Sequence, residues 1–298
     1  MSNNVSYNEE YIKLINKALT EYIPKTELYD SRLVESVEYS LLNGGKRIRP
    51  LLTLEFCKAC NGDINLALPF ACAVEMIHTS SLIHDDLPCM DDDDMRRGKP
   101  SNHIEFGQAT AVLAGDTLLN YAYEIMLDSK AAKETKTQNR AIKCAYELAK
   151  SSGVYGMMGG QAIDLYYEDK KATEDIVLKM YEKKTGAIIR AACKMGCMIS
   201  SDDENKVMAA DEYAKAIGLS FQIVDDILDL TSDNETLGKP VKSDISKNKM
   251  TYVSINGIDR SRKKVRELTE KALKALDVFD GDTKFLKELA LYLENRKN

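Results

Sequence analysis

Tryptophan is absent from the 298 residues, and proline and glycine are scarce, at six and sixteen. Long windows rich in Ala, Leu, Glu and Lys alternate with short polar breaks, which favours helices over strands. With 44% hydrophobic and 30% charged residues, the chain has the composition of a globular protein. The scarcity of chain-breaking residues therefore predicts an all-α fold.

A surplus of positive charge is also missing. Lys and Arg number 41 against 47 Asp and Glu, and the net charge of −6 argues against a nucleic-acid partner held by bulk charge. No apolar run approaches the roughly 18 residues that a membrane span needs, and the polar, acidic start is unlike a signal peptide. The seven cysteines are scattered and odd in number, as is typical of reduced thiols. We therefore expect a cytoplasmic protein without a membrane span.

Helical patterns cover most of the chain. They predict two amphipathic helices in 8–42, broken near Pro24, and further helices at about 51–60, 66–83, 106–127, 140–152, 154–168, 176–199, 204–230, 259–276 and 282–296. The polar connection at 128–139 is too short to mark a domain boundary, so we expect one domain over 1–298. Residues 231–249 break every helical pattern, and so long an irregular segment beside a candidate site is typical of a lid.

An acidic stretch follows the apolar pattern at 66–83. It holds Asp85 and Asp86, breaks at Pro88, and continues with Asp91 and three more aspartates. Carboxylates so close together repel one another unless cations or bulk water surround them. A bend at Pro88 can return Asp91 to the side of Asp85, and all-oxygen clusters of this kind suit Mg²⁺. A solvated acidic loop is the alternative.

A second acidic motif lies about 140 residues later, inside another apolar helical run. Asp225 and Asp229 are four residues apart and share a helix face, with Gln222 one turn earlier and Asp226 next to the first aspartate. Carboxylates among Ile, Val and Leu are costly unless they are paired or metal-bound. The two motifs together predict two carboxylate walls that face each other across a cavity.

Two further segments suit anions or a bent helix. The glycines at 44–45 precede Lys46-Arg-Ile-Arg-Pro50, and glycine lets backbone N–H groups approach an anion closely; a basic helix start on the surface is the alternative. Gly186 follows Lys184 and Thr185 inside a helical pattern, where glycine costs roughly 1 kcal/mol. It predicts a kink or a close ligand, and a kink would turn the preceding carbonyls inward. Gln161 and Asp164, one turn apart, are expected to support the site rather than only to pair with each other.

These motifs together resemble the trans-isoprenyl diphosphate synthases of the short-chain bacterial type, the group of farnesyl and geranylgeranyl diphosphate synthases. The resemblance covers essentially the whole chain. Its motifs occur in the family's order: Gly44-Gly-Lys-Arg-Ile-Arg-Pro50, the two aspartate motifs, Arg96-Arg97-Gly98, Gly159-Gly-Gln161, Lys184-Thr185 and Gly238-Lys239. It implies the isoprenoid synthase fold, a bundle of antiparallel helices around a deep central cavity, usually in a homodimer.

The resemblance also implies roles for the matching residues. Three Mg²⁺ would hold the allylic diphosphate, with metal binding assigned to Asp85, Asp91 and Asp225, and with Asp86 and Asp229 in support; Asp226 counts among the catalytic residues of the second motif. The positions that match the allylic diphosphate site are Arg96, Lys184, Gln222, Lys239 and Lys249, with Thr185 close to the reacting carbon. The positions that match the isopentenyl diphosphate site are Lys46, Arg49, His78 and Arg97. Arg47 receives no role and is expected at the surface.

The implied reaction is ionisation, condensation and elimination. Mg²⁺ and cationic side chains draw charge off the leaving diphosphate, so the allylic C–O bond of dimethylallyl, geranyl or farnesyl diphosphate ionises. The double bond of isopentenyl diphosphate attacks the cation, and the departing diphosphate takes the proton. The product is farnesyl or geranylgeranyl diphosphate, and water-free helix walls protect the cation.

Three rival functions fit parts of the sequence. An HD-type metal phosphohydrolase, suggested by His84 beside Asp85, needs more histidine ligands than three histidines provide. A terpene cyclase lacks the basic turn at 44–50, which binds a second diphosphate. A non-catalytic partner subunit of a prenyl synthase usually loses aspartates, and none is missing from either motif here.

Product length depends on the face of the helix below Asp85. Ser81 and Ser80 lie four and five residues before that aspartate, about one turn below it. In the farnesyl-producing members of the family, an aromatic residue commonly fills the position of Ser80 and floors the cavity. Serine leaves room for about one more five-carbon unit, which favours a C20 over a C15 product. Alternatively, another part of the chain supplies the floor, from Met76, Ile77 or the region 121–123.

Overall fold

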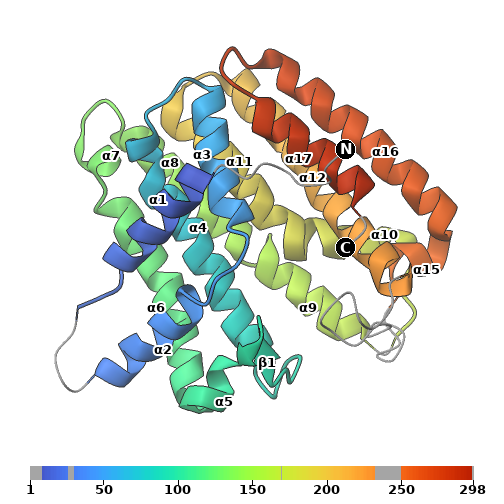
Figure 1. Ribbon diagram of the computed structural model, residues 1–298, viewed down its shortest axis with the longest axis horizontal. Helices are drawn as coiled ribbons and strands as arrows, with labels where there is room; N and C mark the ends of the chain where they lie inside the picture. Colours follow the sequence, from blue (N-terminus) through green and yellow to red (C-terminus); the bar gives the residue numbers. More distant parts are fainter. Residues whose placement is uncertain (1–8, 26–29, 169, 232–249, 297–298) are drawn as a thin grey trace.

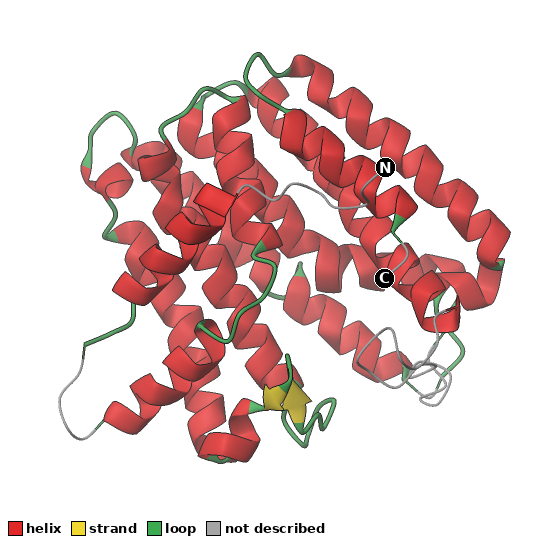
Figure 2. Cartoon of the chain, in the orientation of Figure 1, coloured by secondary structure: helices red, strands yellow, loops and turns green. Residues whose placement is uncertain are grey.

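Helices make up nearly all of the computed structural model, which describes residues 9–25, 30–168, 170–231 and 250–296. Within these ranges the only strands are β1 (Met95–Arg96) and β2 (Lys99–Pro100), an antiparallel hairpin (Figures 1 and 2). The helices are α1 (Glu9–Glu21), α2 (Ser31–Leu41), α3 (Ile48–Ala59), α4 (Ile64–Asp85), α5 (Asn102–Phe106), α6 (Gln108–Leu127), α7 (Lys130–Lys133), α8 (Gln138–Ser152), α9 (Met157–Tyr167), α10 (Glu174–Tyr181), η1 (Glu182–Gly186), α11 (Ala187–Ser200), α12 (Glu204–Thr231), α15 (Tyr252–Asn256), α16 (Ile258–Ala275), η2 (Leu276–Val278) and α17 (Lys284–Asn295). The predicted all-α class is confirmed.

Most predicted helices exist, but some boundaries differ for local reasons. The helix expected from residue 106 is split at Gly107, whose φ of +87° ends α5 before α6 begins. The helix expected from residue 51 begins already at Ile48, because Arg47 adopts a left-handed backbone and serves as its N-cap. The polar connection at 128–139 contains the single-turn helix α7. The expected lid at 231–249 falls outside the described residues apart from Thr231, the last residue of α12.

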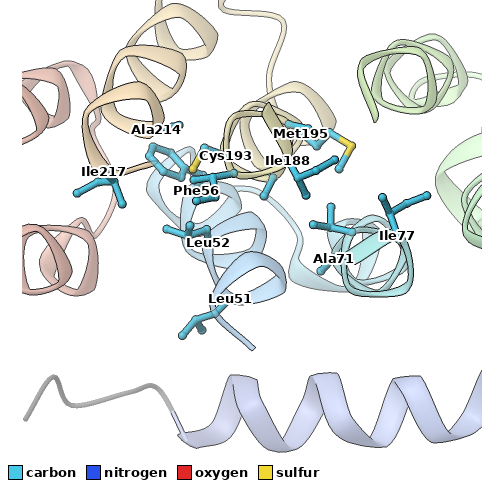
Figure 3. Packing of buried hydrophobic residues seen from close by; sticks show 14 of the residues in the cluster. Leu51, Leu52, Phe56, Ala71, Ile77, Ile188, Cys193, Met195, Ala214 and Ile217 are labelled. Atoms are coloured by element: carbon cyan, nitrogen blue, oxygen red, sulfur yellow. The ribbon is translucent and has the colours of Figure 1, made fainter. Parts of the chain in front are cut away.

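The hydrophobic core surrounds α4 and continues into α3, α11 and α12. Every residue from Pro69 to Ile77 is buried, so this part of α4 has no solvent-facing side. Figure 3 shows side chains from four helices that interlock in the core: Leu51, Leu52 and Phe56 of α3, Ala71 and Ile77 of α4, Ile188, Cys193 and Met195 of α11, and Ala214 and Ile217 of α12. Burying apolar surface on this scale is the main contribution to the stability of the bundle.

A close helix contact aligns α3 with α11. A β-carbon at Gly196 would lie 2.3 Å from the carbonyl oxygen of Thr53 and 3.0 Å from the backbone nitrogen of Cys57. A larger residue at this position would have to push the helices apart. This contact fixes the second half of α3 against α11, the helix that continues the π-helical turn η1.

Contrary to the expectation from the sequence, one helix among the described residues, α4, is long and apolar enough to cross a membrane. The most apolar window of α4 has a mean hydropathy of 1.5, and 72% of that window is buried inside the protein. In the core of the bundle (Figure 1), α4 packs against α3, α6 and α11. The central helix of a soluble bundle passes the same length and composition test, so α4 is weak evidence for a membrane span.

Candidate active site

The chain bends back on itself after α4, as the proline at position 88 predicts. The backbone N–H of Asp91 donates a hydrogen bond to the carbonyl oxygen of Asp85, 2.8 Å away. Burial raises the pKa of the Asp85 carboxyl to about 6, and Lys184 partly offsets this shift while Asp91 adds to it. The charged form of Asp85 is therefore disfavoured at this position, and a bound cation would favour it.

Asp86 points to a different partner. Only 2% of this residue is exposed, and its carboxylate accepts hydrogen bonds from the Arg96 guanidinium, with distances of 3.0 and 3.1 Å to Nε. The same guanidinium lies 3.2 Å from Asp93. A metal at Asp86 would have to displace Arg96, just as one at Asp225 would have to displace its own arginine partner, and the supporting metal role of Asp86 stays a prediction. In this structure Asp86 fixes Arg96 beside the motif.

The second acidic motif lies on α12. Asp225 forms an ion pair with Arg296, with 2.7 Å between Oδ1 and Nη1. The buried Asp226 accepts a hydrogen bond from the Tyr181 hydroxyl at 2.7 Å, which connects α12 with α10, and its catalytic role stays a prediction. Asp229 follows Asp225 by one helical turn, as predicted.

The predicted kink before Gly186 is present as the π-helical turn η1. A π turn carries an extra residue and is frequent at functional sites. Lys184, in this turn, forms an ion pair with the buried Asp164 of α9. A β-carbon at Gly160 would lie 2.1 Å from the backbone nitrogen of Lys184, so glycine at that position lets α9 lie directly against the turn.

Gln161 has a different environment from its neighbour Asp164. Both polar side-chain atoms of Gln161 are buried, and neither has a hydrogen-bond partner among the described residues. The residue lines the main cavity. The two residues expected to support the site are thus separated: Asp164 orients Lys184, and Gln161 offers an amide to whatever occupies the cavity.

A cluster of positively charged side chains lies where Arg97 meets the basic turn. Arg97 donates a hydrogen bond to the carbonyl oxygen of Gly44 at 2.7 Å, and its guanidinium carbon would lie 2.8 Å from a β-carbon at Gly45. With a φ of +110°, position 45 also needs glycine for its backbone. Burial lowers the pKa of His78 well below its usual range, and the nearby Arg49 and Arg97 lower it further.

These cations lack a matching set of anions. The Nε atom of Arg49 is buried without a hydrogen-bond partner among the described residues, and burial lowers the pKa of this guanidinium, as it does for Arg97. Lys46 is exposed at the rim of this cluster. Partial loss of its hydration and the nearby Arg296 lower its pKa. The grouping of Arg49, His78 and Arg97 fits a multiply charged anion such as a diphosphate.

A cavity of about 450 Å³ is bordered by Asp85 of the first motif and by Gln222, one turn before the aspartates of the second. Its polar lining consists of Arg49, His78, Ser80, Ser81, His84, Asp85, Gln161, Lys184, Thr185 and Gln222. Its apolar lining consists of Leu82, Met90, Leu119, Met157, Met158, Ala162, Leu165, Ile188 and Phe221. Lys184 and Gln222 also line a second cavity of about 180 Å³, with Asp226. The pattern suits a ligand with a charged head and a hydrocarbon tail.

The residues that line this cavity can be compared with those expected to form its floor. Ser80 and Ser81 border the cavity, as predicted. Met76 and Ile77 are packed into the core at 0% exposure and, like the region 121–123, are not among the described residues that line this cavity. The neighbouring helices contribute Leu119 and Met157 instead.

Some site residues were placed wrongly from the sequence or missed. Arg47 is 3% exposed and paired with Glu75, so the expectation of a surface residue is wrong. A lone acid within the apolar run of α4 was a usable signal for that pairing. Arg296 and Tyr181 gave no signal, because nothing in their sequence neighbourhood marks them. Lys239 and Lys249 lie outside the described residues.

The carboxylates fit Mg²⁺ without forming a complete cage. Among the described residues, no three His, Cys, Asp or Glu side chains converge on one point as metal ligands would. Mg²⁺ commonly takes one or two carboxylates together with phosphate oxygens and water. Asp85 and Asp91 lie side by side, and a cation bound between them would offset the repulsion by which Asp91 raises the pKa of Asp85.

Known proteins are similar to this chain over most of its length. The family model described as polyprenyl synthetase matches residues 30–287. The farnesyl diphosphate synthase of Escherichia coli strain K12 is 42% identical over 292 residues, which cover 97% of each chain. The large subunit 1 of a chloroplastic heterodimeric geranylgeranyl pyrophosphate synthase from Arabidopsis thaliana is 41% identical over 99% of this chain and 80% of its own. The apo crystal structure of an FPP/GFPP synthase from Zymomonas mobilis matches with a TM-score of 0.84 and 34% identity, over 96% of both chains.

Proposed function

The chain belongs to the polyprenyl synthetase family, and we propose that it is a short-chain trans-prenyltransferase. It condenses isopentenyl diphosphate with an allylic diphosphate and releases diphosphate. The observation that carries this proposal is that one and the same cavity is bordered by Asp85 and Lys184 and by Arg49 and His78. Two anionic head groups need two charged sites, and the cavity connects both with an apolar tunnel for the tail.

The residues of the first charged site hold the allylic substrate. Lys184 and Gln222 border both cavities, so they can donate to diphosphate oxygens at the junction. Mg²⁺, held by Asp85, Asp91 and Asp225, would neutralise the charge that develops on the leaving diphosphate. Asp164 orients the Lys184 ammonium through their ion pair.

The second charged site holds isopentenyl diphosphate. Arg49 and Arg97 supply guanidiniums that can bind phosphate oxygens in pairs, and His78 can donate a hydrogen bond as a neutral imidazole. Thr185 borders the cavity between the two sites, where its hydroxyl and the carbonyls of the π turn can stabilise the allylic cation. The apolar side chains from α6, α9 and α11 exclude water, which would otherwise quench that cation.

Product length follows from the depth of the apolar part. Ser80 and Ser81 border the cavity with small side chains, which supports a C20 rather than a C15 product. The relatives' names, which include farnesyl, geranylgeranyl and FPP/GFPP synthases, leave this choice open.

We further propose a homodimer in a reducing, cytoplasmic compartment. Large apolar side chains outside the cavity lining are exposed on α6 and α9: Val112, Leu113 and Tyr166. Such a surface suits a second copy of the chain. All seven cysteines are free thiols, which suits a reducing compartment. Sedimentation equilibrium that gives the mass of one chain would contradict the dimer.

The test is incubation of the purified protein with labelled isopentenyl diphosphate and dimethylallyl, geranyl or farnesyl diphosphate, with and without Mg²⁺. We expect a longer prenyl diphosphate plus free diphosphate, only when Mg²⁺ and both substrates are present. A cyclic hydrocarbon formed from the allylic substrate alone would indicate a terpene cyclase. Phosphate released from nucleotides would indicate a phosphohydrolase. No product unless a second polypeptide is added would indicate a partner subunit.

A further inference from the structure

Arg47 is the one cation of the basic turn that points into the protein. Its guanidinium lies 2.7 Å from the carboxylate of Glu75, and both side chains are 2% exposed. It also donates hydrogen bonds to the carbonyl oxygen of Leu41 at 2.8 Å and to the Asn16 side chain at 3.0 Å. One side chain thereby connects the start of α3 with α1, α2 and α4.

The backbone at Arg47 is bent to make this possible. Its φ of +49° and ψ of +34° lie in the left-handed region, which is unfavourable for a non-glycine residue. The two neighbouring cations have different surroundings. Lys46 is exposed to solvent, and Arg49 borders the cavity. The left-handed turn at Arg47 lies just before α3, so it separates the inward direction of Arg47 from that of Arg49, the second residue of the helix.

Glu75 is the anion that could disturb this arrangement. It is buried on α4, one turn before His78, and its charge acts on both Arg49 and Arg97. A buried carboxylate without a partner would attract the nearest guanidinium. Arg47 already holds this carboxylate, and the Nε atom of Arg49 has no partner among the described residues.

We propose that Arg47 is a positioning residue for the homoallylic substrate, because by holding Glu75 it keeps Arg49 available to bind the diphosphate of isopentenyl diphosphate. The inference rests on the proposed function. Arg47 touches no substrate; it sets the direction of the basic turn and prevents an ion pair between Glu75 and Arg49. The charge of Arg47 is therefore needed only as long as Glu75 is charged.

The test uses steady-state kinetics of Arg47→Met, Arg47→Lys and the double variant Arg47→Met/Glu75→Gln. We expect Arg47→Met to raise KM for isopentenyl diphosphate about ten-fold or more, with KM for the allylic diphosphate changed less than about three-fold. Arg47→Lys can still pair with Glu75 and should show a smaller increase. The double variant should recover much of the lost affinity, because the competing carboxylate is gone.

A purely structural role gives a different pattern. In that case Arg47→Met and the double variant would both lose thermal stability and turnover, with equal effects on the two KM values, and the inference would be wrong. Arg140→Met is the matched control, since it breaks an arginine–aspartate pair with Asp202 away from the cavity and should leave both KM values unchanged. If Arg47→Met does not fold, the double variant decides: a KM for isopentenyl diphosphate about ten-fold or more above wild type, although the competing carboxylate is gone, contradicts the inference. An inactive wild-type protein would instead contradict the proposed function.

Discussion

The guanidinium of Arg296 lies 2.7 Å from the carboxylate of Asp225, so the residue after α17 contacts the second acidic motif. The guanidinium also stacks near the ring of Phe221, 5.4 Å from its centroid. Residues about 70 positions apart thus meet at the rim of the site. This ion pair takes one of the carboxylates that we propose for Mg²⁺.

Arg296→Gln should bind Mg²⁺ more tightly in the absence of substrates. The guanidinium and the metal compete for Asp225, and a partly exposed pair of this kind contributes roughly 1 kcal/mol, or about five-fold in affinity. Isothermal titration of the substrate-free protein with Mg²⁺ measures this. Arg262→Gln, at an exposed position of α16, is the control and should titrate like wild type. Weaker binding in Arg296→Gln would show that the ion pair does not compete.

Asp85→Ala and Asp225→Ala should each lower turnover by about three orders of magnitude or more, because each removes a proposed metal ligand. Neither melting temperature should fall far below the wild-type value, since neither change removes apolar packing. Steady-state rates at saturating Mg²⁺ and scanning calorimetry provide the two measurements. Asp94→Asn, which changes an exposed residue of the same acidic stretch, should keep wild-type turnover. Near-normal rates in both alanine variants would refute the metal assignment.

The metal-free protein should lose stability through Asp85 as pH rises from 4 to 7. The pKa of this carboxyl is about 6 in the folded state and 3.8 in the unfolded chain. Between these values the unfolded chain has released a proton that the folded chain still holds, so deprotonation favours unfolding. The melting temperature of Asp85→Asn minus that of wild type, measured in EDTA, should therefore increase over this range. A constant difference would mean that Asp85 titrates normally.

Lys46→Ala and Arg49→Ala should raise KM for isopentenyl diphosphate about ten-fold or more, and KM for the allylic diphosphate much less. Both residues belong to the basic turn, which lies apart from the aspartate motifs in sequence. Initial rates with one substrate varied at saturating levels of the other give the two constants. Lys17→Ala, an exposed change on α1, is the control. Equal increases for both substrates would assign the turn to another role.

Ser80→Tyr should shorten the product. The residue is 2% exposed and borders the cavity, so a tyrosine ring would fill the space that the growing tail needs. Chromatography of the dephosphorylated products should show a shift from C20 to C15, whereas Ser80→Ala, which keeps the side chain small, should leave the distribution unchanged. A C15 product from wild type that Ser80→Tyr leaves unaltered would show that another residue sets the length.

Local patterns were enough to predict much of this molecule. The periodicity of apolar residues placed the helices, the proline at position 88 predicted the return of Asp91 to Asp85, and Gly186 predicted the distortion that proved to be a π turn. Each of these depends on residues close in sequence. Such features follow from backbone sterics and side-chain spacing.

Pairings between distant segments could not be predicted in the same way. Asp86 looked equivalent to Asp85, but one residue of helix rotation turns it toward Arg96. Arg47 looked like its basic neighbours, although a left-handed backbone turns it toward Glu75. Which of several adjacent charges is buried depends on the tertiary contacts of the whole bundle.

The complete burial of α4 between Pro69 and Ile77 has a consequence for how this protein can change over evolution. A substitution in that segment meets tightly packed neighbours, so a change of size there would disturb the core. One turn later, at Ser80 and Ser81, the same helix borders empty space. Side chains at these two positions can grow without forcing the bundle to repack. Product length can therefore diverge by single substitutions while the scaffold around it stays under strong constraint.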